Sequence, residues 1–196
     1  MLGLLGKPQL SRRHLLIASL GAPALPAWAQ KPEAMTLPFR GASFVHRWSQ
    51  GDQHEFTPAN DADLKTWRDM ITLNMHAQTA NAEQLADVAN RVLANYQQHG
   101  KILQTRSTPR NAQRPAEHLI VAVLGTPQLL EATFARCLLH EGTGLIAVVS
   151  HRIYGKGVGP EMSQWLAAHG AQTEQALMGW GQLPSTSSLN RLPRSA

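Results

Sequence analysis

The sequence has 196 residues, 43% of them hydrophobic and 16% charged, a composition that allows one packed core and excludes wholesale disorder. Five of the 18 Lys and Arg residues lie before residue 30 or after residue 183, which leaves 13 basic residues against the 13 acidic ones. The body of the chain is therefore formally neutral, and its composition argues against the sustained cationic surface that nucleic-acid binding requires.

Residues 1–29 have the three parts of an export signal. The basic pair Arg12 and Arg13 precedes an apolar stretch of six residues, and a small-x-small pattern ends at Ala29, before Gln30. We therefore expect a signal peptide that is cleaved between Ala29 and Gln30, and a periplasmic mature protein. The apolar stretch is too short to cross about 30 Å of hydrocarbon, so no stable membrane insertion is expected.

The arginine pair is followed by His-Leu-Leu and resembles a twin-arginine export motif, although the lysine often found at the end of that motif is missing. The twin-arginine translocase is therefore the expected export partner, and the general secretory machinery stays open as the alternative. Cys137 is the only cysteine, so no internal disulfide can form in an oxidising compartment. A mid-strand cysteine of this kind is expected to be a buried, inert thiol.

The first part of the mature chain predicts a linker over residues 30–42 and two short strands, 43–48 and 53–57, around a Gly-Asp turn. An even-numbered loop would place His46 beside Glu55 and point His46 and His54 to opposite faces. Only an odd-numbered loop or a bulge would bring the two histidines together.

Two helices are expected next. Leu64, Trp67, Ile71 and Met75 recur at steps of three and four, which predicts a helix from residue 61. The second helix begins near a good cap, Asn81, and stops at Gly100.

The periodicity then changes to that of strands. Residues 101–108 predict one strand, and the runs 117–124, 129–140 and 145–154 are joined by glycine-containing turns, which predicts an antiparallel three-stranded meander. Pro160 suits the first position of a final helix. Residues 184–196 are rich in serine and are expected to be a disordered tail.

These elements predict a single α+β domain over residues 43–183. Its antiparallel sheet has about six strands, is covered by helices and follows the N-terminal signal peptide. The order of two strands, two helices, about four strands and a helix resembles the PsbP-type fold, named for an extrinsic subunit of photosystem II and shared by varied small proteins. The strings HRW at 46–48, HEFTP at 54–58 and SHRIYG at 150–155 are similar to small exported bacterial proteins of unknown function. That resemblance implies no assigned activity.

The meander also predicts a candidate site. Alternation along its strands gathers polar side chains on the face opposite the apolar core: His118, Glu131, Ser150, Arg152 and Tyr154. The two faces follow whether each turn has two or four residues, and with Leu124 facing Leu129 and His140 facing Leu145, Glu131 and Arg152 are diagonal neighbours. The cluster is either a ligand pocket in which Arg152 clamps an anion and His118 or Glu131 exchanges a proton, or an ordinary cross-strand ion pair beside a satisfied histidine.

The functional expectation is a non-catalytic binding or accessory module for an unknown periplasmic protein or small ligand. No metal or cofactor is predicted, because the histidines lack ligand spacing, and no nucleophile motif is present. The basic loop 106–114 offers a second contact surface. Two alternatives stay open: a small hydrolase-like enzyme that uses His118, Glu131 and Arg152, and a metal or cofactor carrier.

Overall fold

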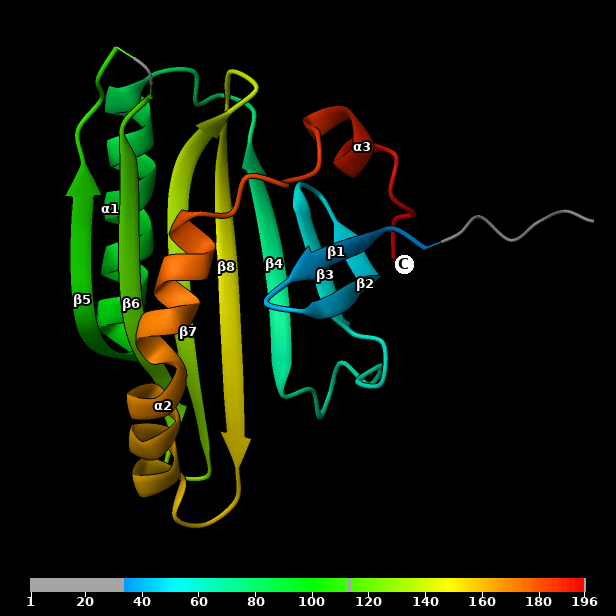
Figure 1. Ribbon diagram of the computed structural model, residues 1–196, viewed down its shortest axis with the longest axis vertical. Coiled ribbons are helices and arrows are strands. Elements are labelled where there is room, and N and C mark those ends of the chain that lie inside the picture. Colours follow the sequence, from blue (N-terminus) through cyan, green and yellow to red (C-terminus); the bar gives the residue numbers. More distant parts are fainter. Residues whose placement is uncertain (1–33, 113, 196) are drawn as a thin grey trace, which may run out of the picture. The chain divides into compact units, whose positions relative to one another are not determined.

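An antiparallel sheet of eight strands organises the part of the chain that the computed structural model describes, residues 34–112 and 114–195 (Figure 1). Its spatial order is β1-β2-β3-β4-β8-β7-β6-β5. The strands are β1 (Thr36–Phe39), β2 (Ala42–Gln50), β3 (Gln53–Pro58), β4 (Asp69–His76), β5 (Gly100–Thr108), β6 (Glu117–Thr126), β7 (Leu129–His140) and β8 (Thr143–Tyr154). The export signal expected over residues 1–29 lies outside the described residues.

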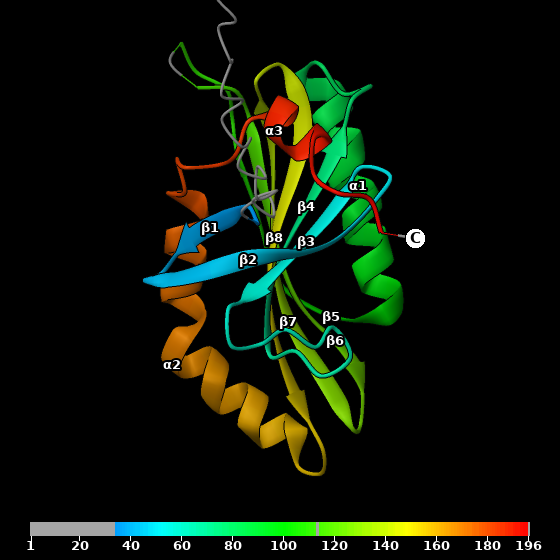
Figure 2. The same ribbon diagram turned by 90° about the vertical axis from the view of Figure 1, so that its right-hand side faces the viewer.

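Two long helices, α1 (Ala82–His99) and α2 (Val158–Met178), lie on opposite sides of this sheet (Figure 2). One face of the sheet carries Ile120, Ala135 and Ile146, which pack in one cluster with buried residues of α1. The helix contacts β5, β6 and β7, and we call this face the α1 face. The face that carries Val121, Phe134 and Val149 is the α2 face, which packs against α2. The α+β class with an antiparallel sheet and covering helices is thus confirmed, with eight strands instead of about six.

The C-terminal meander forms as the sequence predicts, with the shorter of the two turn lengths considered and a register that differs from the expected one. Thr126 pairs with Leu129 and His140 with Thr143, so each turn has two residues instead of four. In the second turn Glu141 and Gly142 both have positive φ, as a tight hairpin turn requires. The register therefore moves by two residues, which preserves the two faces and makes Glu131 and Arg152 directly opposite partners instead of diagonal neighbours.

The prediction of a helix from residue 61 is wrong, because this segment forms turns followed by β4. β4 pairs with β3 on one side and along its whole length with β8 on the other, from Asp69 with His151 to His76 with Gly144. Ile71, Leu73 and Met75 are buried at every second position, which is a strand period. This change also alters the element order on which the resemblance to the PsbP-type fold rests.

Both ends of the described region hold more structure than the sequence suggests. β1 lies inside the stretch interpreted as a linker, and it pairs with β2 through Leu37 and Phe39. Inside the expected disordered tail, α3 (Thr186–Asn190) forms behind the cap Ser185, and Leu189 is fully buried. The sequence criterion failed because these short segments gain order from a few buried apolar side chains and not from local periodicity.

The β2–β3 hairpin contains the bulge that brings two histidines together. Its register shifts between His46 and Trp48, so Trp48, not His46, pairs with Glu55. The extra residue, Arg47, reaches the end of β3, where its guanidinium donates hydrogen bonds to Thr57 and Pro58. The hydroxyl of Ser49 consequently lies 2.7 Å from Nε2 of His46 and 2.8 Å from Nδ1 of His54.

Cys137 lies on the α1 face and is fully buried, as expected. Burial raises the pKa of its thiol to about 12. The nucleophilic thiolate is therefore nearly absent at pH 8. We expect the native protein to resist iodoacetamide at pH 8 over hours and the urea-unfolded protein to react within minutes, as measured by mass spectrometry. Rapid modification of the native protein would contradict this placement.

Candidate ligand-binding site

A hollow of about 400 Å³ opens on the α1 face, beside α1. One wall is Tyr96 of α1, and another comes from Leu64 and Trp67 in the segment before β4. The sheet forms the floor. We call this space the α1-face hollow.

The floor is polar because successive strands present hydrophilic side chains in register on this face. Glu55 of β3 pairs with Thr72 of β4, and Ser150 of β8 pairs with Thr133 of β7. The polar groups that line the hollow are Gln53, Glu55, Thr72, Asn74, Tyr96, Glu131, Thr133, Ser150 and Arg152. Amides and hydroxyls thus outnumber the ionised groups, which are two carboxylates and one guanidinium.

Arg152 is held on several sides. Its Nε donates to Oε2 of Glu131 at 2.7 Å, and its guanidinium carbon lies 3.9 Å from the centre of the Trp67 ring. Burial lowers the pKa of Arg152, but the Glu131 charge and the hydroxyl of Tyr154 outweigh this effect and raise it above its ordinary value. Arg152 thus forms the cross-strand ion pair with Glu131 that is one of the two expectations for this cluster, and its charge is balanced by that carboxylate.

The deepest polar groups of the hollow are hydroxyls. Thr133 is 2% exposed and Ser150 is 4% exposed. Burial raises the pKa of Tyr96, against the effect of a hydrogen bond with Thr133, so its phenol stays protonated at neutral pH. Glu55 accepts a hydrogen bond from the Gln53 amide at 2.8 Å. The site therefore offers neutral donors and acceptors and carries one formal negative charge, since two carboxylates face one guanidinium.

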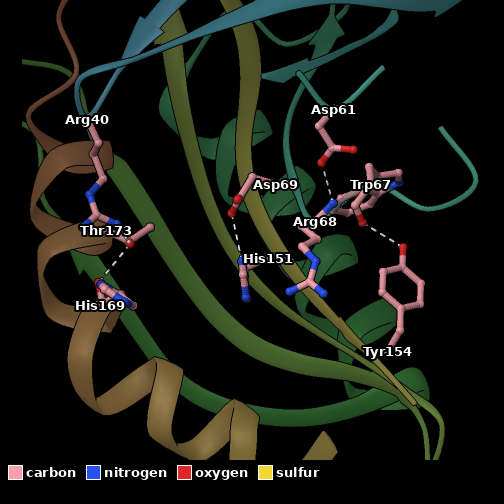
Figure 3. Close-up of polar contacts among 9 residues, drawn as sticks. All are labelled: Arg40, Asp61, Trp67, Arg68, Asp69, His151, Tyr154, His169 and Thr173. Carbon is pink, nitrogen blue, oxygen red and sulfur yellow. Dashed lines mark hydrogen bonds and ion pairs between the residues drawn. The ribbon is translucent and has the colours of Figure 1, made fainter. Parts of the chain in front are cut away.

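The sequence-predicted residues divide into two groups. Glu131, Ser150 and Arg152 line the hollow. Tyr154 is not among the lining residues. Its hydroxyl donates a hydrogen bond of 2.8 Å to the carbonyl of Trp67 and so ties the end of β8 to the segment that carries this wall residue (Figure 3).

His118 lies far from the other predicted residues. It pairs with Cys137 and hydrogen-bonds Ser107, whereas Glu131 pairs with Leu124. About 20 Å of strand β6 separates His118 from Leu124 at about 3.4 Å per residue. The proton-exchange pairing of His118 with Glu131 and Arg152 therefore does not form, which removes the geometric basis of the hydrolase-like alternative.

A second hollow of about 410 Å³ adjoins the first along α1. Gln53 and Asn74 line both spaces, and the second continues toward His76 and Arg91. Together they leave the α1 face open from β8 to the β2–β3 turn.

The residues that form the walls of the α1-face hollow were not predicted from the sequence. Trp67 and the β4 residues Thr72 and Asn74 were assigned to a helix, so they could not be placed beside β8. The alternation of Ile71, Thr72, Leu73, Asn74 and Met75 was the signal that could have placed them. Within the described residues, no group of three or more His, Cys, Asp or Glu side chains could hold a metal ion.

Comparison with known proteins does not assign the chain to a family. No family model matches the sequence, and no curated protein matches it. The sequence-based resemblances to the PsbP-type fold and to small exported proteins therefore stay predictions.

Two solved structures are similar to this chain at low superposition scores. A protein of unknown function from Pseudomonas aeruginosa, PA94, superposes with a TM-score of 0.44 and 14% identity over 78% of this chain and 99% of that chain. Human STARD10 superposes with a TM-score of 0.29 and 12% identity over 70% of this chain and 74% of that chain. Neither similarity is high enough to indicate what this chain binds.

Proposed function

We propose that this chain is a non-catalytic binding module that holds a small, uncharged, hydroxyl-rich molecule in the α1-face hollow. The observation that carries the proposal is a concave site of about 400 Å³ whose floor consists of buried hydroxyls and side-chain amides. This volume lies in the range typical of small-molecule sites. A binding role needs no nucleophile and base that point to one atom. It is also compatible with an Arg152 side chain that is held in place by its ion pair with Glu131.

The chemistry of the lining favours a neutral ligand. Arg152 is already paired with Glu131, and Glu55 adds an uncompensated negative charge, so an anion would meet net repulsion. Thr133, Ser150 and Asn74 present both donors and acceptors, as a polyol or sugar requires.

The periplasm is the proposed location. The pattern of residues 1–29, with Arg12 and Arg13 before an apolar stretch and a cut between Ala29 and Gln30, supports export through the twin-arginine or the general secretory machinery. Those residues lie outside the described part of the chain. Within the described part, no helix is long and apolar enough to span a bilayer.

Saturation-transfer NMR with glucose, ribose, myo-inositol and trehalose tests the proposal. We expect at least one of the four to receive magnetisation from the protein and to bind measurably in calorimetry. Replacing Asn74 with alanine should raise the Kd about tenfold, because it removes one of the two amides that line both hollows, together with its one or two hydrogen bonds, at about 1 kcal/mol each.

The matched control is Asn90→Ala, the same substitution at an exposed position of α1. It should leave the Kd unchanged. The proposal fails if none of the four compounds binds with a Kd below 10 mM, or if Asn74→Ala and Asn90→Ala behave alike.

A further inference from the structure

The α2 face carries a separate hollow of about 300 Å³, on the opposite side of the sheet from the α1-face hollow. We call it the α2-face hollow. Five parts of the chain build it: the β1–β2 hairpin, the end of β3, the start of β4, the C-terminal half of β8 and the middle of α2. Its apolar walls include Phe39, Phe44, Pro58, Val149 and Trp165. Its polar lining residues are Arg40, Asp69, Ser150, His151, His169 and Thr173.

His151 is fixed in this hollow on two sides. Asp69 is its direct cross-strand partner, and the Asp69 carboxylate accepts a hydrogen bond from Nδ1 at 2.9 Å (Figure 3). The imidazole stacks on Trp165 with the ring centres 4.1 Å apart and an angle of 4° between the planes. A carboxylate on Nδ1 fixes the tautomer and leaves Nε2 to bind another group. None of the described residues hydrogen-bonds that Nε2.

Arg40 brings a cation to the same space from the β1–β2 turn. Its φ of 49° is the positive value that a two-residue hairpin turn requires, as at Glu141 in the β7–β8 turn. Its guanidinium donates to the hydroxyl of Thr173 and to the side-chain oxygen of Gln172 on α2. A guanidinium has five donors, so three remain for a ligand.

Arg40 gives this hollow an exposed cation with unused donors, in contrast to Arg152 of the α1-face hollow, which is paired with Glu131. The Asp69 carboxylate accepts its hydrogen bond from His151 and balances Arg40 in formal charge, so an anion would be held by direct hydrogen bonds from Arg40 and not by net charge. The surrounding walls are mostly aromatic, which suits a planar apolar ring. The volume matches a molecule of about two fused rings, at the lower end of small-molecule sites.

From these observations we infer that the α2-face hollow is a second binding site, for a small planar aromatic carboxylate. The ring lies between the phenylalanine walls and Trp165. The carboxylate accepts hydrogen bonds from Arg40, and Nε2 of His151 hydrogen-bonds a polar substituent on the ring. This inference does not depend on the function proposed for the α1 face.

Calorimetry with 2-naphthoate and its neutral counterpart 2-naphthamide tests the site on the full chain. We expect 2-naphthoate to bind at least tenfold more tightly than 2-naphthamide, since a charge-assisted hydrogen bond contributes that much or more. Arg40→Gln should abolish this preference, and Arg40→Lys should retain part of it. Arg91→Gln, which removes an arginine from the opposite face, should leave it intact.

The role of His151 is tested with 6-hydroxy-2-naphthoate. It should bind several-fold more tightly than 2-naphthoate, and His151→Phe should remove this gain, because phenylalanine keeps the stacking on Trp165 but lacks Nε2.

The inference is wrong if 2-naphthoate does not bind with a Kd below 10 mM, if the acid and the amide bind equally, or if the preference survives Arg40→Gln. If the hydroxyl gives no gain, or the gain persists in His151→Phe, the assignment of His151 is overturned. Shifts of the His151 and His169 ring signals in NMR spectra would locate a bound ring at this hollow, and shifts confined to other residues would contradict the placement.

Discussion

Replacing Arg136 with methionine should lower the free energy of unfolding by about 3 kcal/mol, one of the largest effects expected for a single substitution in this chain. Arg136 is 8% exposed on the α2 face, and its Nε and Nη2 donate to both carboxylate oxygens of Glu117 at 3.0 and 2.9 Å. Its Nη1 donates to the carbonyls of Leu177 and Trp180 at the end of α2, both at 3.0 Å. Methionine leaves all of these acceptors without their donor, and urea unfolding monitored by circular dichroism measures the loss.

The matched control is Arg106→Met. Arg106 forms a comparably short ion pair, 2.7 Å to Glu174, but its side chain is 47% exposed. Exposed pairs of this kind contribute about 0–1 kcal/mol, so this variant should lie within that range of the wild type. The double variant Arg136→Met with Glu117→Met should recover part of the loss, because it removes the stranded carboxylate but not the two stranded carbonyls. Equal losses for Arg136→Met and Arg106→Met would contradict the structural role of Arg136.

The extent to which the sequence predicts this fold depends on how local each signal is. The three strands of the meander carry strict alternation, so the two faces follow even though the expected pairing register was wrong by two residues. The prediction for β4 was wrong because the spacing of Leu64, Trp67, Ile71 and Met75 also fits a helix. The choice between the two periods is made by β3 and β8, whose pairing with β4 is not local.

The candidate sites follow the same rule. Glu131, Ser150 and Arg152 could be placed together from alternation alone, because one continuous meander holds all three. The Asp69 and His151 pair could not, since it joins strands that are 82 residues apart and one of them was taken for a helix. Arg136 was available in principle, because alternation places it between Phe134 and Leu138 on the core face, where an arginine needs a buried partner.

The second large effect concerns pH and is centred on His54. This residue is fully buried, and its Nε2 has no hydrogen-bond partner among the described residues. Burial, together with the charges of Arg194 and His46 and against that of Asp52, lowers the pKa of His54 to about 4. The unfolded chain binds a proton here near pH 6.5, whereas the folded chain resists it. The stabilisation from neutral His54 is therefore complete above about pH 6.5 and is lost as the pH falls toward 4.

Between pH 7 and pH 4.5 this single histidine should account for about 2 kcal/mol of lost stability, at about 1.4 kcal/mol per unit of pKa difference. His54→Leu should therefore lose about 2 kcal/mol less than the wild type over that interval, in urea titrations at the two pH values. Cys137→Ala controls for destabilisation without titration, because burial keeps that thiol protonated throughout the range. It should retain the wild-type pH dependence. The prediction is wrong if His54→Leu shows the same pH dependence as the wild type. The loss of stability in acid would then come from the other histidines whose pKa is lowered, which are His46, His76 and His118.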